Sequence, residues 1–482
     1  MARLAGTTLP PPGWMIGADA EITGITADSR AVRPGMIFAA LPGVHADGRA
    51  FIADAVARGA AAVLAPEGTA WPACTPPRPL LADPEPRRRL AEIAALLAGP
   101  MPHSILAVTG TNGKTSTVDF LRQMMAMAGK QAASLGTLGL IAPGFPPGAS
   151  LTTPDPVSLA ETMARLKSAG IEHVALEASS HGLDQRRLDG LHLAGAAFTN
   201  LTRDHLDYHG DMAAYRTAKL RLFAELLPPG APVAAMADLD AETLAALREI
   251  AKRRHLDFST VGENGSAIRL AEARPLPEGQ ALSVSAGGRA REIILPLPGR
   301  FQADNALLAA CLARASGVDS ALDSLAALAP VRGRLERAAV LPNGAAAYVD
   351  YAHTPDALER LLAALRPHAA GRLVLVFGAG GDRDRGKRPL MGTIAARDAD
   401  VAIVTDDNPR GEEPGAIRAA ILAACPGAAE IGDRRSAIAA GLALLRPGDV
   451  LAVAGKGHEQ GQIVGDAVLP FDDASVIREL AP

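Results

Sequence analysis

Aromatic residues are scarce in this chain of 482 residues, since Phe, Trp and Tyr together make up only 3%. Its charge is also nearly balanced, with 48 Lys and Arg against 52 Asp and Glu and a formal net charge of −4. Proteins that bind nucleic acids usually carry a basic surface or aromatic platforms for the bases. We therefore expect no nucleic-acid partner and infer that any phosphates bound here belong to small molecules.

Cysteine is equally rare, and the three present, Cys74, Cys311 and Cys425, lie far apart. An odd number argues against a disulfide framework, and the spacing lacks the pattern of a zinc site. The chain has no run of about 18 apolar residues, and its first residues, which lead into Pro10-Pro11-Pro12, are too interrupted for a signal peptide. These absences predict a soluble cytoplasmic protein with no membrane span.

A single hydrophobic core cannot serve a chain of this length, and the usual size of domains suggests about three. Prolines between residues 76 and 86 precede a predicted helix over 87–97, which ends at Gly99-Pro100. The segment 330–334 (PVRGR) is a plausible hinge. We therefore place the domains at residues 1–99, 100–331 and 332–482.

Strands and helices are predicted to alternate in all three domains, which indicates an α/β fold. A helix from residue 51 leads into a strand over 61–64 in the first, small α/β domain. The central domain is expected to be P-loop ATPase-like with a mostly parallel sheet, and the last to be Rossmann-like and doubly wound. The further predicted strands are 105–108, 132–135, 174–177, 196–199, 233–237, 345–350, 372–377, 400–405 and 449–454; the further helices are 114–128, 157–169, 212–227 and 301–315.

A glycine-containing loop follows the apolar run at 105–108 and is the strongest functional signal. It consists of Gly110, Thr111, Asn112, Gly113, Lys114, Thr115 and Ser116. Backbone N–H groups, the helix N-terminus and the Lys114 ammonium are suited to phosphate groups, and Thr115 to a magnesium ion. Val108 replaces the first glycine of the strict G-x-x-x-x-G-K-[ST] pattern, so the alternative is an ordinary glycine-rich turn.

Two polar segments follow predicted strands of the central domain, residues 177–182 (EASSHG) and 200–210 (NLTRDHLDYHG). Ligands of open α/β sheets gather at the C-terminal ends of the strands. Glu177 and His205 are therefore candidate ligands of a second magnesium ion. The alternative is that Glu177 caps a helix and His205 is a solvated loop residue, while Asp204 and Asp207 could equally be helix caps.

Three strand ends of the last domain also carry charged residues. Arg383 lies in a loop that departs from the dinucleotide fingerprint G-x-G-x-x-G, Asp407-Asn408-Pro409-Arg410 follows the next strand, and Gly455 and Glu459 follow the last. Arginines would suit a carboxylate and Glu459 an ammonium group, so the predicted ligand is a small zwitterion. The alternative is a mesh of surface salt bridges.

Taken together, these motifs resemble those of the Mur ligase family. The resemblance is carried by residues 110–115, 177–182 and 200–210, by 215–219 (YRTAK) and 350–356 (DYAHTPD), and by 455–459 (GKGHE), which span nearly the whole chain in order. It implies ATP-dependent amide formation in peptidoglycan precursor synthesis. It further implies that the first domain binds the UDP part of UDP-N-acetylmuramoyl-L-alanyl-D-glutamate, the second ATP and Mg²⁺, and the third the incoming amino acid. Separately, we expect the protein to be a monomer.

The resemblance also implies residue roles. Lys114 would contact the β- and γ-phosphates, and Thr115, Glu177 and His205 would hold magnesium. Lys219 corresponds to a lysine that the family carbamylates. The other implied contacts are Asn305, Arg334 and Asp350 with the nucleotide, Ser29 with uridine, and Thr152, Thr153, Ser179, Gln185 and Arg187 with the muramoyl-dipeptide.

Arg410 is the residue on which the expected choice of amino acid depends. The segment Asp407-Asn408-Pro409-Arg410 resembles the form found in family members that add meso-2,6-diaminopimelate. This resemblance implies that the Arg410 guanidinium donates two hydrogen bonds to the distal carboxylate of that substrate. One rival is a family member that adds L-lysine, and Arg410 argues against it. The other is a nucleotide switch of GTPase type, but the chain has no Asn-Lys-x-Asp guanine signature.

Overall fold

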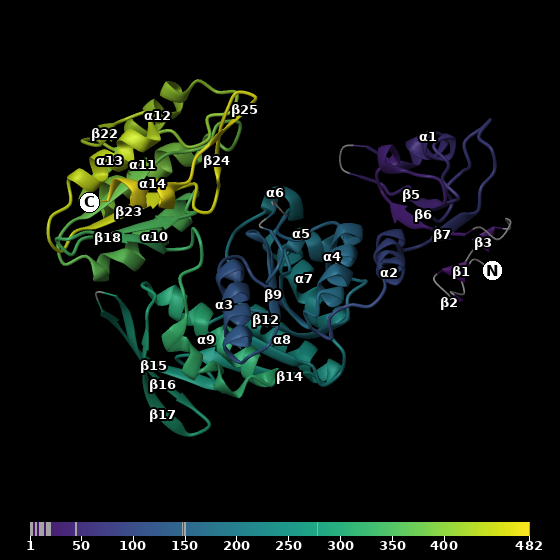
Figure 1. Cartoon of the computed structure of the whole chain (residues 1–482), viewed down its shortest axis with the longest axis horizontal. Helices are drawn as coiled ribbons and strands as arrows, with labels where there is room; N and C mark the ends of the chain where they lie inside the picture. The colour runs from purple at the N-terminus through teal and green to yellow at the C-terminus, as the bar shows by residue number, and fades with distance from the viewer. Residues whose placement is uncertain are drawn as a thin grey trace. The chain divides into compact units, whose positions relative to one another are not determined.

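The structure, a computed structural model, describes residues 3–4, 7–8, 14–15, 21–43, 46–146, 148, 151–276 and 278–481. Most of the N-terminal segment considered for a signal peptide lies outside these residues. The chain divides into two compact units, Met1–Val261 with Leu308–Ala321 and Gly262–Leu307 with Leu322–Pro482 (Figure 1). Within the described residues, no helix is long and apolar enough to cross a membrane.

The first unit begins with a small sheet of strand order β3-β7-β6-β5-β4, in which β3 is antiparallel to β7 and the other pairs are parallel. Helix α2 starts with a proline in its first turn and ends at Gly99, whose φ of +92° breaks the helix. The predicted helix over 87–97 is thus confirmed. The elements of this region are β1 (Arg3–Leu4), β2 (Thr7–Thr8), β3 (Trp14–Met15), β4 (Gly24–Thr26), β5 (Met36–Ala39), α1 (Ile52–Ala57), β6 (Ala62–Pro66), β7 (Leu80–Asp83) and α2 (Pro86–Ala98).

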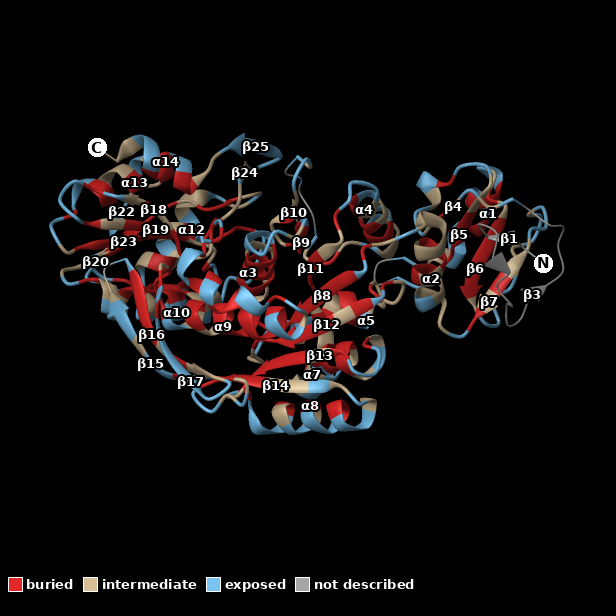
Figure 2. Ribbon diagram, turned by 60° about the horizontal axis from the view of Figure 1, so that its bottom comes forward, coloured by how far each residue is buried: buried red, intermediate tan, exposed pale blue. Residues whose placement is uncertain are grey.

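A larger sheet follows in the same unit, with the order β10-β9-β11-β8-β12-β13-β14. All neighbours are parallel except β10, and every residue of the central strand β8 is buried, as Figure 2 shows. Its elements are β8 (Ser104–Thr109), α3 (Lys114–Met127), β9 (Ala132–Gly136), β10 (Gly139–Ile141), α4 (Pro156–Ser168), β11 (His173–Glu177), α5 (Ser180–Asp184), β12 (Leu193–Phe198), α6 (Leu206–His209), α7 (Met212–Arg221), β13 (Pro232–Met236), α8 (Ala241–Arg254) and β14 (Asp257–Gly262).

The order of this sheet places the glycine loop at a topological switch point. From β8 the chain passes first to β9 and β11 on one side and later to β12 and β13 on the other. Ligands of open α/β sheets bind in the crevice at such a point. One prediction needs correction here, because the helix expected over 212–227 is α-helical only to Arg221 and continues as a π-helical turn over Leu222–Leu226.

The second unit contains a second doubly wound sheet, of order β18-β19-β23-β20-β21-β22, in which only the edge strand β18 is antiparallel. Two separate hydrophobic clusters, one on each face, pack it against helices. The predicted strands at 345–350, 372–377, 400–405 and 449–454 are confirmed as β19, β20, β21 and β23. The elements are β18 (Glu336–Val340), β19 (Ala346–Asp350), α10 (Pro355–Leu365), β20 (Leu373–Phe377), α11 (Lys387–Asp398), β21 (Val401–Val404), α12 (Pro414–Leu422), β22 (Ala429–Glu430), α13 (Arg434–Ala443), β23 (Val450–Ala454), β24 (Gly461–Val464), β25 (Ala467–Pro470) and α14 (Asp473–Leu480).

An antiparallel meander, which the sequence analysis did not predict, begins the second unit. Its strands are β15 (Ile268–Leu276), β16 (Gly279–Ala286) and β17 (Arg289–Leu295). Helix α9 (Arg300–Ala315) follows it and confirms the helix predicted over 301–315.

Candidate active site

The glycine loop connects β8 to α3 and is held against the end of β12. Gly110 has a φ of +143°, and a Cβ atom there would overlap Thr199 Oγ1. The backbone N–H of Thr111 donates to Asn200 O (2.8 Å), and the N–H of Asn112 donates to Asn200 Oδ1 (2.9 Å). Gly113, with a φ of +83°, precedes the first residue of α3. The feature suited to phosphate groups is therefore the N-terminus of α3, which the loop leads into, since the N–H groups of Thr111 and Asn112 already donate to Asn200.

Two lysines converge on one carbonyl group of this loop. Lys114 Nζ donates to Gly110 O (3.0 Å) and Thr111 O (2.8 Å), and Lys219 Nζ donates to Gly110 O (2.7 Å). Lys219 is only 1% exposed. Burial, together with the Lys114 charge, holds the pKa of the Lys219 amine well below its usual range, while Asp204 acts in the opposite direction. The amine of Lys219 is therefore neutral far more readily than that of an ordinary lysine.

Glu177 ends β11 and is 1% exposed. Its Oε1 accepts from the N–H of Thr137 (2.7 Å) and its Oε2 from Thr137 Oγ1 (3.2 Å). The interpretation of Glu177 as a helix cap is wrong, because α5 is capped by Ser179, whose Oγ accepts from the N–H of Gly182 (3.0 Å). Glu177 is instead a buried carboxylate at the sheet edge beside the glycine loop.

His205 is an exposed residue, as the alternative of a solvated loop residue predicts, and aromatic rings lie beside it. Its ring centroid is 4.8 Å from that of His181 and 6.2 Å from that of Tyr215, although its side chain is 47% exposed. Burial, followed by the neighbouring imidazoles, lowers the pKa of His181, and burial likewise lowers that of His209. His181 and His209 belong to the polar segments 177–182 and 200–210, but no sequence pattern predicts that their rings form a cluster with His205.

Asp204 and Asp207 are not helix caps, so that alternative is also wrong. Helix α6 begins without a side-chain cap, and α7 is capped by Asp211. Asp204 Oδ1 instead accepts from the N–H of His205 (2.9 Å). In the part of the chain that the structure describes, no three His, Cys, Asp or Glu side chains are grouped so as to hold a metal ion. Any metal held near Glu177 and His205 therefore needs ligands of another kind.

The residues expected to contact the muramoyl-dipeptide are brought together in one hydrogen-bond network. Thr153 Oγ1 donates to Glu177 O (2.8 Å) and accepts from the N–H of Ser179 (3.0 Å). Arg187 NH1 donates to Thr153 O (2.6 Å), and its NH2 donates to Gln185 Oε1 (2.8 Å). Thr152 shares a hydroxyl hydrogen bond of 3.0 Å with Thr137, which also binds Glu177.

Ser29, the expected uridine contact, lies apart from this network in the small N-terminal sheet. It begins a 3-10 turn between β4 and β5, where Asp28 accepts from the N–H of Arg30 (2.9 Å). The described contacts of Ser29 do not include any of the muramoyl-dipeptide residues.

Arg334, Asp350 and Asn305 belong to the second unit. Asp350 ends β19 and accepts from the N–H groups of Leu335 (2.7 Å) and Ala352 (2.9 Å). Burial raises the pKa of its carboxyl to about 6, against the opposing effect of Arg334. The Arg334 guanidinium lies over the Tyr351 ring at 4.8 Å, and Asn305 is buried in α9.

Three loops of the second unit meet as the sequence predicted, because β23, β20 and β21 are neighbours in the sheet. Asn408 Nδ2 donates to Glu459 Oε2 (2.8 Å), and Lys456 Nζ donates to both Asn408 Oδ1 and Glu459 Oε2 (3.1 Å each). A Cβ atom on Gly455 would overlap Asp407 Oδ2, so the two loops are in contact there as well. These bonds are buried or partly buried, which argues against a mesh of surface salt bridges.

Arg410 follows Pro409 in a left-handed conformation, with a φ of +52°. Its NH1 donates to Gly381 O (2.9 Å), so it reaches the loop after β20. Its backbone pairs with β24, since its N–H donates to Ile463 O (3.0 Å) and its carbonyl accepts from the N–H of Gly465 (2.7 Å). Arg383 is exposed, and its NH1 donates to Asp382 O (3.3 Å) rather than to the Asn408 network.

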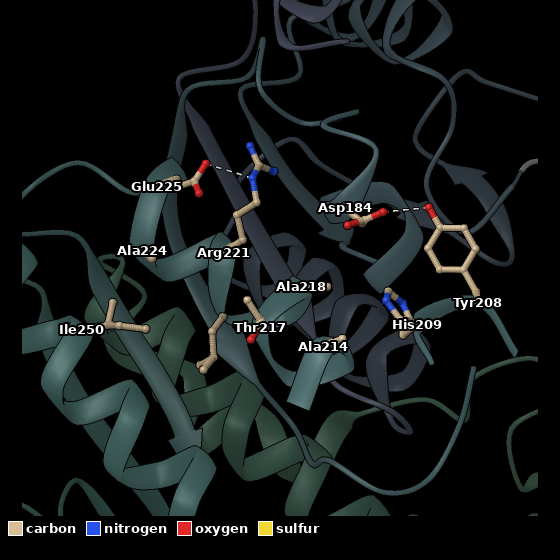
Figure 3. A pocket seen from close by; sticks show the side chains of 11 residues that line it. Asp184, Tyr208, His209, Ala214, Thr217, Ala218, Arg221, Ala224, Glu225 and Ile250 are labelled. Carbon is tan, nitrogen blue, oxygen red and sulfur yellow. Dashed lines mark hydrogen bonds and ion pairs between the residues drawn. The ribbon is translucent and has the colours of Figure 1, made fainter. Parts of the chain in front are cut away.

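A cavity of about 720 Å³ lies on another side of α7 (Figure 3). Thr217 and Arg221 line it, and each is about 200° around the helix from Lys219. Tyr208 OH donates to Asp184 Oδ2 (2.7 Å) at one end, and Arg221 Nε pairs with Glu225 Oε2 (2.9 Å) at the other. None of the predicted site residues lines this cavity.

Three family models match this chain and together cover most of it. They are the Mur ligase family catalytic domain over residues 21–96, the Mur ligase middle domain over 108–313 and the glutamate ligase domain of Mur ligases over 333–457. The UDP-N-acetylmuramoyl-L-alanyl-D-glutamate--2,6-diaminopimelate ligase of Caulobacter vibrioides is 55% identical, with 95% of each chain covered.

Solved structures agree with these matches. A UDP-N-acetylmuramoyl-L-alanyl-D-glutamate--2,6-diaminopimelate ligase superposes with a TM-score of 0.72 at 32% identity, covering 97% of each chain. The MurF ligase of Thermotoga maritima, solved with ADP, gives a TM-score of 0.61 at 18% identity over 92% of this chain and 96% of that one. The second likeness supports the fold alone.

Proposed function

Because this chain belongs to the Mur ligase family, we propose that it joins meso-2,6-diaminopimelate to the D-glutamate of UDP-N-acetylmuramoyl-L-alanyl-D-glutamate at the expense of ATP. The observation that carries the proposal is the relative that is 55% identical over 95% of both chains and bears the name of that ligase. The enzyme acts in peptidoglycan precursor synthesis in the cytoplasm, as a monomer.

The three regions of the chain divide the substrates among them in this proposal. Residues 1–99 take the UDP group, with Ser29 at the uridine. Residues 100–331 take ATP, and residues 332–482 take the amino acid. Thr152, Thr153, Ser179, Gln185 and Arg187 bind the muramoyl-dipeptide, and their shared hydrogen-bond network supports a common ligand.

The glycine loop is proposed to hold the phosphates of ATP. Residues 110–116 are assigned to the phosphates. The N-terminus of α3 faces them and Lys114 supplies a charge for the β- and γ-phosphates, whereas the N–H groups of Thr111 and Asn112 donate to Asn200 and hold the loop in place. The Lys114 ammonium already lies over the loop, on the carbonyls of Gly110 and Thr111. Asn305, Arg334 and Asp350 are assigned to the rest of the nucleotide.

Magnesium is assigned to Thr115, Glu177 and His205. The fit rests on Glu177, a buried carboxylate whose described hydrogen bonds come from the neutral donors of Thr137. A buried carboxylate is costly without a cation, and carboxylate oxygen is a preferred ligand of magnesium. When bound, the ion offsets the repulsion between the phosphates and the attacking carboxylate.

The reaction proceeds through an acyl phosphate. An oxygen of the D-glutamate γ-carboxylate attacks the γ-phosphorus, and the bond from that phosphorus to ADP breaks. The amine of diaminopimelate then attacks the acyl carbon, phosphate leaves with the bonding electrons, and the amine loses a proton. Lys114 stabilises negative charge in the first step by position and electrostatics, so no covalent enzyme intermediate is required.

The amino acid is assigned to Arg383, Asp407, Asn408, Pro409, Arg410, Gly455 and Glu459. Arg410 provides a planar donor for the distal carboxylate of diaminopimelate, and Glu459 an acceptor for an ammonium group. L-lysine lacks that carboxylate and would leave the guanidinium unpaired, which adds a penalty in a closed site.

The test is phosphate release by the purified protein with ATP, the UDP-dipeptide and a panel of amino acids. We expect kcat/KM for meso-diaminopimelate to exceed that for L-lysine by roughly 10-fold or more, the worth of one charge-assisted contact. Arg410→Ala should raise the KM for diaminopimelate while ATP binding persists. Equal kcat/KM values, or a preference for lysine, would overturn the assignment of Arg410 and favour the lysine-adding rival.

A further inference from the structure

Lys456 is a fully buried lysine placed between two residues assigned to the amino acid. Its exposed fraction is 0%. Its Nζ donates to Asn408 Oδ1 (3.1 Å), to Glu459 Oε2 (3.1 Å) and to Gly461 O (2.6 Å). An ammonium group has three N–H donors, and all three are used by these acceptors. Lys456 therefore has no donor left for a ligand and can act only through its partners.

Those partners are held in one orientation each. Asn408 Oδ1 accepts from Lys456 and from the N–H of Ile463 (2.9 Å), so the Asn408 amide must turn its Nδ2 toward Glu459. Glu459 Oε2 then receives two hydrogen bonds, from Asn408 Nδ2 (2.8 Å) and from Lys456. Among the described residues no hydrogen bond reaches Glu459 Oε1, and the Glu459 side chain is 31% exposed whereas Asn408 is 3% exposed.

We propose that Lys456 is a positioning residue for the amino-acid substrate: it fixes Asn408 and one oxygen of Glu459, so that the other oxygen, Oε1, is presented to an ammonium group of the diamino acid. The inference rests on the proposed function. Its physical basis is that a carboxylate tied at one oxygen has little rotational freedom left to lose when the ligand binds. Without the Lys456 ammonium, the buried amide of Asn408 and the carboxylate of Glu459 both lose their orienting partner.

The first experiment replaces the charge but keeps the length of the side chain. Lys456→Met is expected to raise the KM for meso-diaminopimelate by about 10- to 100-fold, the worth of hydrogen bonds to a charged group. The KM values for ATP and for the UDP-dipeptide are expected to stay within about twofold and kcat within about threefold, because those contacts are not oriented by Lys456. Steady-state phosphate release measures all four constants.

A double-mutant cycle separates positioning from a general effect on the domain. If Lys456 acts through Glu459, the variant with Lys456→Met and Glu459→Gln should have nearly the KM for diaminopimelate of Glu459→Gln alone. Independent effects would multiply instead. A multiplied KM in the double variant would overturn the proposal, as would an unchanged KM in Lys456→Met or a joint rise in the KM values of all three substrates.

Arg372→Met is the matched control. Arg372 NH2 pairs with Asp449 Oδ2 (2.7 Å) where β20 and β23 begin, at the other end of the strands that lead to Gly378 and Gly455. This variant should lower the melting temperature and leave the KM for diaminopimelate unchanged; a raised KM would show that any destabilisation of the domain has this effect.

If Lys456→Met does not fold, Lys456→Gln replaces it in the same assays. If neither variant folds, Lys456 has a role in folding and the proposal that it positions Glu459 is overturned. The wild-type protein is assayed first. If its phosphate release does not depend on diaminopimelate, the proposed function itself is contradicted.

Discussion

The amine of Lys219 lies in a setting that disfavours its charged form. It is buried beside Lys114, and its pKa is therefore held well below its usual range. A neutral amine can attack carbon dioxide, forming an N–C bond and releasing one proton. The product is a carbamate, whose negative charge would replace the repulsion between the two lysines by attraction. The setting thus supports the carbamylation proposed from the family resemblance.

Replacement of Lys219 should separate the carbamate from a plain lysine. We expect Lys219→Ala to lose about 100-fold or more in kcat, as for loss of one preorganised electrostatic group, and added formate or acetate to restore part of it. Lys219→Arg should not be rescued, because arginine fills the space and keeps the positive charge. Wild-type activity in carbonate-depleted buffer should fall as the pH is lowered, since the folded protein then protonates the amine and removes the reactive form.

Phosphate release and intact-protein mass under native conditions are the measurements. Absence of rescue by either carboxylate, together with a mass that shows only the plain amine, would remove the carbamate from the mechanism. Arg216, which lies on the same helix and pairs with Glu242, offers a control variant, because it carries no assigned role.

Individual site residues could be predicted from sequence where a motif names them, and not where burial decides their role. Lys456 stands in the recognised segment 455–459, yet sequence analysis assigned only Gly455 and Glu459. Nothing in the amino-acid sequence indicates that the ammonium group of Lys456 is buried and donates to three acceptors. The same holds for Thr137, which binds Glu177 from the strand end of β9 and belongs to none of the motifs.

Helices α13 and α14 are joined by an ion pair that is completely buried. Arg434 Nε and NH2 donate to the two oxygens of Asp473 (2.7 Å each), and both side chains are 0% exposed. Arg434 NH2 also donates to Ala454 O (3.0 Å), the last residue of β23. The pair therefore anchors both helices to the strand that leads to Gly455.

Asp473→Ala should destabilise the protein strongly because it leaves a buried guanidinium without its counter-charge. The expected loss in the free energy of unfolding is roughly 3–5 kcal/mol, whereas replacing both partners by apolar residues of similar size should cost much less. Unfolding in denaturant measures this change in the free energy of unfolding. If the two units unfold in separate transitions, the transition of the second unit is compared; if the chain unfolds in one transition, that transition is compared.

The neighbouring pair Arg435–Glu479 provides the comparison, since it joins the same two helices through exposed side chains, 43% and 64%. Glu479→Ala should leave the unfolding midpoint unchanged within error. Equal losses in the free energy of unfolding for Asp473→Ala and Glu479→Ala would show that the buried ion pair contributes no more to stability than the exposed one.

Secondary structure was predictable where hydrophobic runs are continuous, as in the buried strands β8, β20 and β23. It was missed where strands are half exposed. In β17 only Ile293 and Leu295 are buried, so no apolar run marks the strand. Strand β7 was hidden in a proline-rich stretch, which reads as a loop although β7 itself, Leu80–Asp83, contains no proline. No local pattern in the sequence marks the π-helical turn over Leu222–Leu226.

Over the whole molecule, the proposed machinery is divided between the two compact units. The glycine loop, Glu177 and Lys219 belong to the first, and Arg334, Asp350 and the loops around Asn408 belong to the second. No one unit holds all the residues assigned to the reaction. The order of the motifs predicts that these residues lie in different parts of the chain, but it does not predict the border of the units between Val261 and Gly262.

The coupling of ATP cleavage to both co-substrates is therefore a property of the whole chain, and it separates the ligase from a nucleotide switch. In a ligase the acceptor of the γ-phosphoryl group is the D-glutamate carboxylate rather than water. Positioning of the acceptor contributes several orders of magnitude to such a transfer, so ATP alone should be cleaved at less than about one hundredth of the full rate. With ATP and the UDP-dipeptide but no amine, the reaction should stop near one ADP per enzyme with no phosphate released, because the phosphoryl group stays on the substrate as the acyl phosphate. Hydroxylamine should then attack the acyl carbon, giving a hydroxamate and releasing the phosphate. Assays of ADP and of free phosphate, with each component omitted in turn, test this scheme. A steady ATP hydrolysis that ignores both the UDP-dipeptide and the amino acid would identify a switch-type nucleotide hydrolase and remove the ligase reaction from this protein.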